Sequence, residues 1–266
     1  MEQRPKMLWR SDDLPHVLIL GSIHFQDGAL PGWVWEVHQG ANAVVFEADF
    51  REASPPPTMP QGLLVSSLDP ELWQLVESNA RDFGWDGETI RDLNIQYPFQ
   101  IGQRLAISTL ERAGARFEKG VEGGLLEQTA IPLFLEHCSE FYHALYQNTP
   151  LSEQAACLGL TISRLSQLPE RFRRAAENWR MGEPEAVLDA LGFSEYFSDF
   201  PGLAAGLFGN RHSIWLPRAE YYIQKATELG HRLLIVVGCS HLVGPQSFLA
   251  ELKEHYGYEF HQESRE

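Results

Sequence analysis

Two stretches of the chain have the same pattern, and together they limit the folds open to it. "VLILGSIHFQDG" at residues 17–28 and "LLIVVGCSHLVGP" at residues 233–245 each place an apolar run before a glycine, two further residues and a histidine. A short apolar run without alternation is typical of a strand that is buried on both faces, as in a parallel sheet. The sequence therefore predicts two buried strands, each ending at a GxxH motif.

The two blocks stay in phase beyond the motif. With Gly21 aligned to Gly238, the further matches are His24 with His241, His38 with His255 and Gly40 with Gly257. Each block thus predicts a strand, a GxxH motif, a loop, a helix and a second strand. Residues just past the carboxyl ends of neighbouring parallel strands meet at one edge of the sheet, where open α/β sheets bind their ligands. We therefore expect His24 and His241 to lie together.

The rest of the chain completes an α/β fold: a mixed, largely parallel central sheet flanked by helices, with a helical insert. Further strands are expected at residues 7–9, 42–50, 131–137 and 258–263. Asp69 followed by Pro70 predicts the start of a helix. We expect one domain over residues 1–266, with helical insert segments at about 63–115 and 139–210 and a last long helix at 218–230.

The charge of the chain excludes some partners. There are 21 Lys and Arg residues against 36 Asp and Glu residues, a formal net charge of −15. Phosphate backbones and anionic lipid surfaces are repelled by such a chain, so neither a nucleic acid nor a membrane is an expected partner. The sequence shows no signal peptide and no run of about 18 apolar residues, which predicts a soluble, cytoplasmic protein.

Cysteine usage agrees with a reducing compartment. Cys138, Cys157 and Cys239 are odd in number and have no CxxC spacing, which argues against a disulfide framework and a thiolate zinc site. Cys239 lies inside the second GxxH motif, where a thiol could act as a nucleophile. A small buried thiol is the commoner state of a cytosolic cysteine, and we prefer it here.

Two histidines and an acid at one sheet edge favour metal chemistry. Neutral imidazoles and a carboxylate form a common open divalent-metal site. Glu47 in "VVFEADF" is the natural carboxylate, because its strand is expected beside the first GxxH strand. The alternative is that a GxxH motif occurs by chance and that its histidine is structural. The remaining histidines have no spacing that indicates a role: His16, His137, His143, His212, His231 and His261.

Several segments, in this order, carry a family resemblance: "LWRSDDLPHVLILGSIHF", "AVVFEADF", "KGVEGGLLEQTA" with "LFLE", "NWRMGEPEAVL", "NRHSIW" and "LLIVVGCSHLVGPQSFLAELKEHYGYEF". They resemble the TraB/GumN/PrgY family, to which the Tiki metalloproteases are related. Erythromycin esterases and the haem-binding ChaN-like proteins share the broader fold. The resemblance implies a sheet flanked by helices with a helical insert, and a metal-dependent peptidase or hydrolase activity that favours manganese or cobalt.

The resemblance also implies a set of site residues. These are His24, His241 and Glu47, with Glu122, Glu136 and Arg211 as supporting members. The family usually has an aspartate where this chain has Glu122, which weakens the expectation of a ligand there. Its arginine is commonly followed by an asparagine, whereas His212 follows Arg211 in this chain.

The roles expected of these residues follow from their chemistry. His24 and His241 would bind the metal, and Glu47 would bind it or take a proton from its water. Arg211 would stabilise a developing oxyanion or a substrate carboxylate, or else form a structural ion pair in the crevice. Glu122 and Glu136 are more readily explained as groups that cap a helix or orient a histidine.

The sequence thus predicts a metal-dependent hydrolase that acts on a peptide or another small carbonyl substrate. The expected cofactor is a divalent ion: manganese, cobalt or zinc. Two alternatives remain open. One is a metal-free, histidine-based esterase of the erythromycin esterase type, and the other is a non-catalytic protein that binds a peptide or haem in the same crevice.

Overall fold

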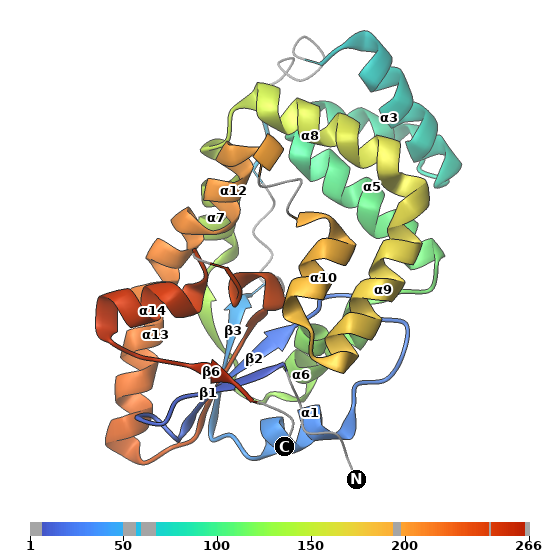
Figure 1. Cartoon of the computed structure of the whole chain (residues 1–266). Helices are drawn as coiled ribbons and strands as arrows, with labels where there is room; N and C mark the ends of the chain where they lie inside the picture. Colours follow the sequence, from blue (N-terminus) through green and yellow to red (C-terminus); the bar gives the residue numbers. More distant parts are fainter. Residues whose placement is uncertain (1–6, 50–56, 60–67, 194–197, 245, 264–266) are drawn as a thin grey trace.

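A six-stranded mixed sheet lies at the base of the molecule (Figure 1). The structure is a computed structural model that describes residues 7–49, 57–59, 68–193, 198–244 and 246–263. The strand order is β4-β3-β5-β2-β1-β6. The strands are β1 (Leu8–Arg10), β2 (Val17–Ser22), β3 (Ala43–Ala48), β4 (Leu133–Glu136), β5 (Leu233–Gly238) and β6 (His261–Gln262). The expected start of the first insert segment, residues 63–67, lies outside the described residues.

The two GxxH strands are neighbours, as the repeated pattern predicts. β2 pairs in parallel with β5, and β5 pairs in parallel with β3, so β5 has a strand on each side. All six of its residues are buried. The sheet register differs from the alignment of the two blocks by one residue, because Gly21 pairs with Val237 and Ser22 pairs with Gly238. Backbone pairing rather than the motif spacing sets the register, so β2 runs one residue past its glycine.

Helices cover the sheet and form a second layer beyond it. The helices are α1 (Gly32–Gln39), α3 (Pro70–Asp82), α4 (Gly87–Asp92), α5 (Pro98–Arg112), α6 (Val121–Gln128), α7 (Cys138–Tyr142), α8 (Leu151–Arg164), α9 (Leu168–Met181), α10 (Pro184–Leu191), α12 (Pro201–Leu207), α13 (Gly209–Leu229) and α14 (Phe248–Tyr256). As predicted, α3 begins after Asp69, whose side chain accepts a hydrogen bond from the Glu71 N–H at 2.7 Å. Short 3₁₀ turns add η2 (Phe117–Lys119) and η5 (Cys239–His241).

The crossover connections place helices on both faces of the sheet. The chain runs from β2 through α1 to β3, and returns from β4 through α13 to β5, so the two crossovers run in opposite directions. Right-handed crossovers of opposite direction lie on opposite faces, and Figure 1 shows α13 and α14 on one side of the sheet and α1 and α6 on the other. At such a reversal in strand order, open α/β sheets bind their ligands beyond the carboxyl ends of the strands.

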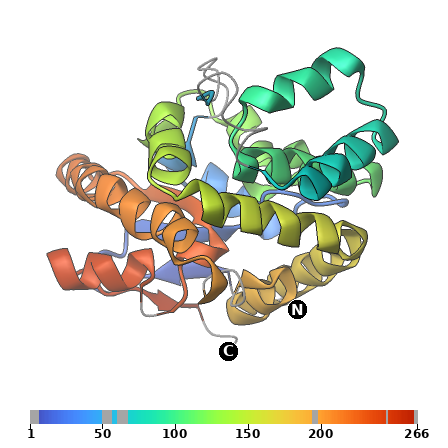
Figure 2. The same cartoon turned by 90° about the horizontal axis from the view of Figure 1, so that it is seen from above.

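The described residues form three hydrophobic clusters, of which two are large. The larger joins the sheet to the helices that cover it, and includes Ile235 of β5, Val34 of α1 and Trp215 of α13. The second is formed mainly by helices α3, α5 and α8, with Ile101 and Leu158 fully buried. In Figure 1 the arrowheads of β2 and β3 point toward the helical layer. Seen from above in Figure 2, the helices around the second cluster (teal and green) and α13 with α14 (orange and red) lie on different sides of the molecule.

One helix begins earlier than the sequence predicts, and this decides where two site residues lie. The expected helix at 218–230 extends back to Gly209, through Pro217 in its interior. A proline removes one backbone hydrogen bond of the helix. Trp215, Ala219 and Ile223 are nevertheless all buried in the sheet cluster, and this packing offsets the loss. Arg211 and His212 therefore lie in the first turn of a long helix, and the second insert segment was expected to end just before them.

The last strand and the cysteines can also be compared with the sequence predictions. The expected strand at residues 258–263 shortens to His261–Gln262, which pairs with β1. Cys138, Cys157 and Cys239 are buried and form no disulfide with one another, and for Cys239 the buried state was expected. No helix in the described part of the chain is both long enough and apolar enough to cross a lipid bilayer.

Candidate active site

Three predicted site residues surround one glycine at the carboxyl edge of the sheet. His24 follows β2, Glu47 lies in β3, and His241 lies in η5 directly after β5. A Cβ atom added to Gly238 would lie 3.0 Å from Glu47 Oε1, 3.5 Å from His241 Cδ2 and 3.6 Å from His24 Nε2. The structure thus places the two GxxH histidines beside the same backbone position. The Gly238 N–H donates a hydrogen bond to Glu47 Oε1, which joins β5 to the carboxylate.

Helix α6 brings Glu122 to His24. The Val121 N–H donates to the Ile23 carbonyl at 3.0 Å, so the start of α6 is bonded to the loop that carries the first GxxH motif. A Cβ atom at Gly120 would lie 2.0 Å from the His24 carbonyl oxygen, a close approach that only glycine permits. Glu122 Oε2 forms an ion pair with His24 Nδ1.

His24, Glu47 and Glu122 form a group that could hold a metal ion. One ligand atom from each residue lies within 4.8 Å of the others. The Glu47 and Glu122 side chains are almost fully buried, whereas 44% of the His24 side chain is exposed. The group is therefore reached from solvent on the His24 side. The expected ligands were His24, His241 and Glu47. The observed group instead includes Glu122, which was expected only as a supporting residue, and does not include His241.

Charge fixes the protonation of the His24 pair. Burial lowers the pKa of the His24 imidazole, but the negative charges of Glu122 and Glu47 outweigh this and raise it to about 9. Burial also raises the pKa of the Glu122 carboxyl, and the His24 charge opposes that rise. The pair therefore holds a proton at neutral pH in the metal-free protein.

Arg211 connects the acids of the site to one another. Its Nε donates to Glu136 Oε1 at 2.8 Å, and its Nη2 lies 3.1 Å from Glu47 Oε2 and also bonds Glu136. Its guanidinium lies between the rings of Phe141 and Trp215, 4.9 Å and 4.5 Å from their centroids. Only 4% of the Arg211 side chain is exposed. These contacts describe a buried ion pair, and the oxyanion role of Arg211 stays a prediction.

Burial and attraction compete at this ion pair. Burial lowers the pKa of the Arg211 guanidinium, but the charges of Glu136 and Glu47 outweigh it and raise the pKa. Burial raises the pKa of the Glu136 carboxyl, against the lowering effect of Arg211. Arg211 pairs with Glu47 and Glu136, and protonated His24 pairs with Glu122, so three carboxyl groups share two positive charges and leave an excess of negative charge that suits a cation.

His241 is neutral and enclosed by aromatic rings. Its ring centroid lies 4.7 Å from that of Trp215 and 4.8 Å from that of Phe208. Burial, and then the positive charge of Arg211, hold the pKa of its imidazole well below 6.5. Its Nε2 lies 3.3 Å from Arg211 Nη1 and 3.9 Å from Glu47 Oε1. His241 thus lies beside the group of His24, Glu47 and Glu122, and its role as a metal ligand stays a prediction.

Two residues that the sequence did not single out extend the site. His212 Nε2 lies 3.0 Å from His241 Nδ1, and His212 Nδ1 lies 2.9 Å from Glu251 Oε1. Burial lowers the pKa of His212, against the raising effect of Glu251. The signal for His212 was its place beside Arg211, where the family resemblance led us to expect asparagine. Nothing in the sequence distinguished Glu251, which lies in the first turn of α14.

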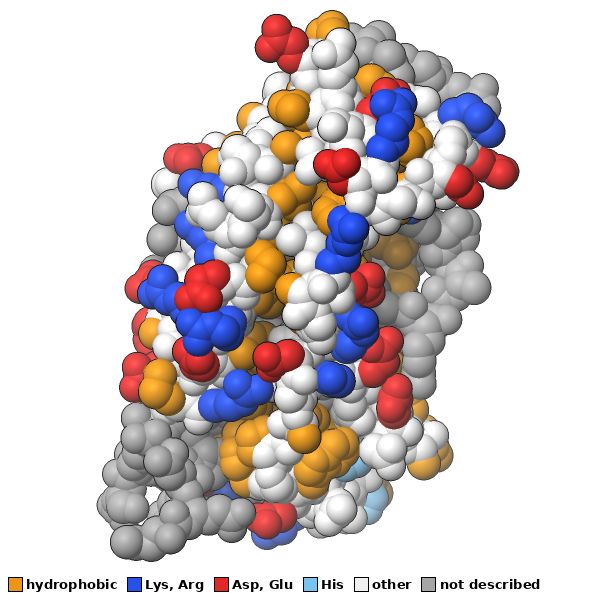
Figure 3. Space-filling view, turned by 90° about the vertical axis from the view of Figure 1, so that its right-hand side faces the viewer, with side chains coloured by type: hydrophobic (Ala, Val, Ile, Leu, Met, Phe, Trp, Pro, Cys, Tyr) orange, Lys and Arg blue, Asp and Glu red, His pale blue; other side chains and the backbone are white. Residues whose placement is uncertain are grey.

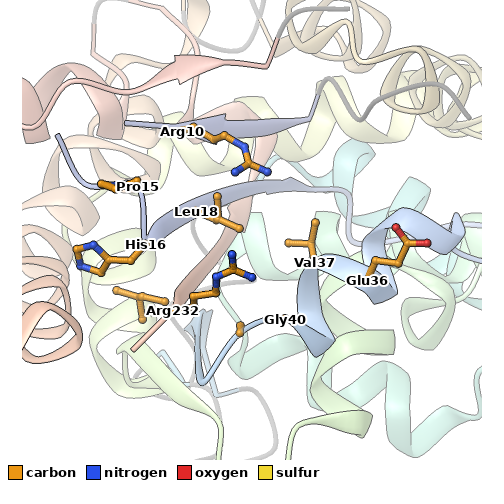
Figure 4. Close-up of a pocket in the computed structure, with 10 residues that line it drawn as sticks. Arg10, Pro15, His16, Leu18, Glu36, Val37, Gly40 and Arg232 are labelled. Atoms are coloured by element: carbon orange, nitrogen blue, oxygen red, sulfur yellow. The ribbon is translucent and has the colours of Figure 1, made fainter. Parts of the chain in front are cut away.

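Two other features carry no chemistry of this site. Burial, and then the charge of Glu47, raise the pKa of the Cys239 thiol to about 12, which leaves it a poor nucleophile. A shallow cavity of about 210 Å³ lies at the opposite, amino-terminal edge of the sheet, where Arg10 and Arg232 lie on either side of Leu18 (Figure 4). Arg10 of this cavity is paired with Glu263.

The surface view agrees with the charge argument. On the face shown in Figure 3, acidic and basic side chains alternate around apolar ones, and no continuous basic patch forms there. Mixed charge of this kind gives no electrostatic groove for a phosphate backbone on that face.

Comparisons with known proteins give one result. A family model described as the TraB/PrgY/gumN family matches residues 7–260 of the 266-residue chain. No curated protein and no solved structure matches it.

Proposed function

The chain belongs to the TraB/PrgY/gumN family, and from this premise we propose that it is a metal-dependent hydrolase that cleaves a peptide or another carbonyl compound. The observation that carries the proposal is the convergence of His24, Glu47 and Glu122 within 4.8 Å at the carboxyl edge of the sheet. One imidazole and two carboxylates are the donor types that manganese, cobalt and zinc accept in open hydrolytic sites.

The donor set fits a divalent cation in charge as well as type. Arg211 is paired with Glu47 and Glu136, and the proton between His24 and Glu122 offsets part of the remaining negative charge. Bound there, a divalent ion lowers the pKa of a water molecule and polarises a carbonyl group. His24, Glu47 and Glu122 would hold the ion, and His24 lies on the solvent side from which a substrate enters.

The other residues position these ligands. Arg211 holds Glu47 through Oε2 while the Gly238 N–H holds it through Oε1, so the carboxylate has little freedom to turn. Glu136 balances part of the charge of Arg211, and its side chain is fully buried. Fixed in this way, the Glu47 carboxylate would hold the ion without having to reorient.

The metal-free esterase has weaker support. A general base needs a free lone pair, and the pKa of about 9 keeps the His24 imidazole protonated at neutral pH. His241 is neutral, but its Nε2 faces the Arg211 guanidinium, which donates to it. Without a cation to displace the proton from His24, neither imidazole is free to activate water.

The test is metal binding followed by activity. Tag-free protein is freed of metal and titrated with Mn²⁺, Co²⁺ and Zn²⁺ by calorimetry, and then assayed on chromogenic esters and peptide libraries. We expect one site per chain and hydrolysis only in the loaded protein. His24→Ala and Glu122→Ala should each abolish metal binding and hydrolysis. His255→Ala, which deletes an exposed imidazole on α14, should leave metal binding and hydrolysis unchanged.

Two outcomes separate the rivals. Hydrolysis that persists in metal-free protein would support the esterase instead. Binding of haem, seen as a visible absorption band after reconstitution and without hydrolysis of any substrate, would support the binding protein.

A further inference from the structure

A chain of hydrogen bonds leads from the edge of the site to the first turn of α14. It runs from Arg211 Nη1 to His241 Nε2 at 3.3 Å, from His241 Nδ1 to His212 Nε2 at 3.0 Å, and from His212 Nδ1 to Glu251 Oε1 at 2.9 Å. His212 is fully buried, and 22% of the Glu251 side chain is exposed. None of the three bonds is local in sequence, so tertiary packing brings these groups together.

The chemistry of its two ends gives this chain a direction. An ionised carboxylate can only accept a hydrogen bond, and a guanidinium can only donate. Glu251 therefore requires the proton of neutral His212 to be on Nδ1, which leaves His212 Nε2 as an acceptor. His241 must then donate from Nδ1, and its Nε2 keeps a lone pair that accepts from Arg211. Every bond is satisfied by one arrangement of protons.

We propose that Glu251 and His212 are positioning residues, which fix His241 as the Nδ1–H tautomer so that its Nε2 lone pair accepts from Arg211, the residue that holds Glu47. Histidines at metal sites commonly have their other nitrogen held by such a partner, which sets the tautomer and the ring orientation. Here the partner is a second histidine, itself set by a carboxylate. The consequence for metal binding rests on the proposed function, whereas the assignment of the tautomer does not.

The surroundings of the two rings strengthen the argument. His212 packs near Trp215, Phe248 and Phe208, with ring centroids 5.4, 5.7 and 6.0 Å away. In so apolar an environment an N–H without an acceptor is costly. Glu251 also lies in the first turn of α14, where a negative charge stabilises the helix. A negative charge stabilises the start of the helix whichever way the Glu251 side chain points. The hydrogen bond to His212 is therefore not explained by that effect.

The experiment reads the tautomers directly in metal-free protein. Long-range proton–nitrogen NMR spectra of ¹⁵N-histidine-labelled protein distinguish a protonated from an unprotonated ring nitrogen. His212→Gln and His241→Gln assign the signals. We expect His212 and His241 each to carry the proton on Nδ1. Glu251→Ala should release the His212 tautomer and shift the His241 signals, whereas Glu254→Gln, an exposed change on the same helix, should leave both unchanged.

Substitutions at His212 give a second readout. His212→Phe keeps an aromatic ring but removes the acceptor, and His212→Gln restores an acceptor. Co²⁺ affinity should fall by about 10-fold or less in the first variant, because the Arg211 contact that holds Glu47 is loosened, and should recover in the second. The proposal is overturned if wild-type His241 carries its proton on Nε2. It is also overturned if the His241 signals in Glu251→Ala and in His212→Phe are the same as in the wild type. If the tautomers are as expected but the protein binds no Co²⁺, the proposed function is wrong, whereas the assignment of Glu251 and His212 as positioning residues remains supported.

Discussion

The His24 imidazole is paired directly with the Glu122 carboxylate, across the gap between the end of β2 and the start of α6. The pair joins two segments that are about a hundred positions apart in the chain, and it shares a proton among the atoms proposed as metal ligands. Since a ligand imidazole must be neutral, the proton and the metal ion compete for the same place. The first two predictions follow from this competition.

Metal binding should release a proton. Because the pKa of His24 is raised to about 9 in the metal-free protein, its imidazole enters the reaction protonated at pH 7.5. Calorimetric titrations with Mn²⁺ in buffers of different ionisation enthalpy should report about one proton released per ion. In His24→Gln the release should vanish together with most of the affinity. Tight binding with no proton release would contradict the assignment of His24.

The stability of the metal-free protein should fall as the pH rises above neutrality. A folded-state pKa of about 9, above the ordinary 6.5 of histidine, means that the pair stabilises the fold fully below pH 6.5. That contribution is lost as the pH rises through about 9. Urea midpoints measured between pH 6 and 9.5 should show this decline. His24→Gln should flatten it, while His255→Ala should retain the wild-type slope.

A single methyl group at Gly238 should weaken metal binding while the fold survives. Its added Cβ would lie 3.0 Å from Glu47 Oε1, so the carboxylate must move. The backbone there, with φ of −52° and ψ of 133°, accepts alanine without strain. We expect Gly238→Ala to lose roughly 10- to 100-fold in Co²⁺ affinity. Gly209→Ala is the matched control, because a Cβ at that position meets nothing within 4 Å. Equal affinities in the two variants would argue against Glu47 as a ligand.

Removing the charge of Arg211 should destabilise the protein strongly. Arg211→Met leaves Glu136 buried without its cation, and breaking a buried pair in this way costs about 3–5 kcal/mol. Chemical unfolding at neutral pH measures the loss. Arg173→Met, on an exposed pair of α9, should leave the midpoint nearly unchanged. A small effect at Arg211 would show that the site tolerates two unpaired carboxylates.

The fold could be predicted from the sequence because its strongest signals are local. The apolar runs at 17–20 and 233–237 are long enough to identify buried strands, and the glycine that opens each motif lies at the strand end or one residue before it. The extension of α13 through Pro217 could not be predicted in this way. Its packing against the sheet outweighs the local preference of proline, and such long-range packing is absent from the sequence pattern.

The candidate site was predictable in its location but not in its detailed grouping. Strand order places His24, Glu47 and His241 at one edge, whatever their side chains do. Which of them share a ligand group depends on the helices that arrive from elsewhere. Helix α6 brings Glu122 to His24, while α13 brings Arg211 and His212 to His241. The hydrogen bond from His212 to Glu251 joins two helices, and no spacing in the sequence encodes it.

The most direct test of the central claim is the position of a bound ion. Crystals of the tag-free protein grown with Mn²⁺ or Co²⁺ would be measured at the absorption edge of the metal. The account predicts one anomalous peak within bonding distance of His24, Glu47 and Glu122, with His241 beside it. A fully loaded crystal with its peak anywhere else, or a His24–Glu122 pair still closed at saturating metal, would contradict it.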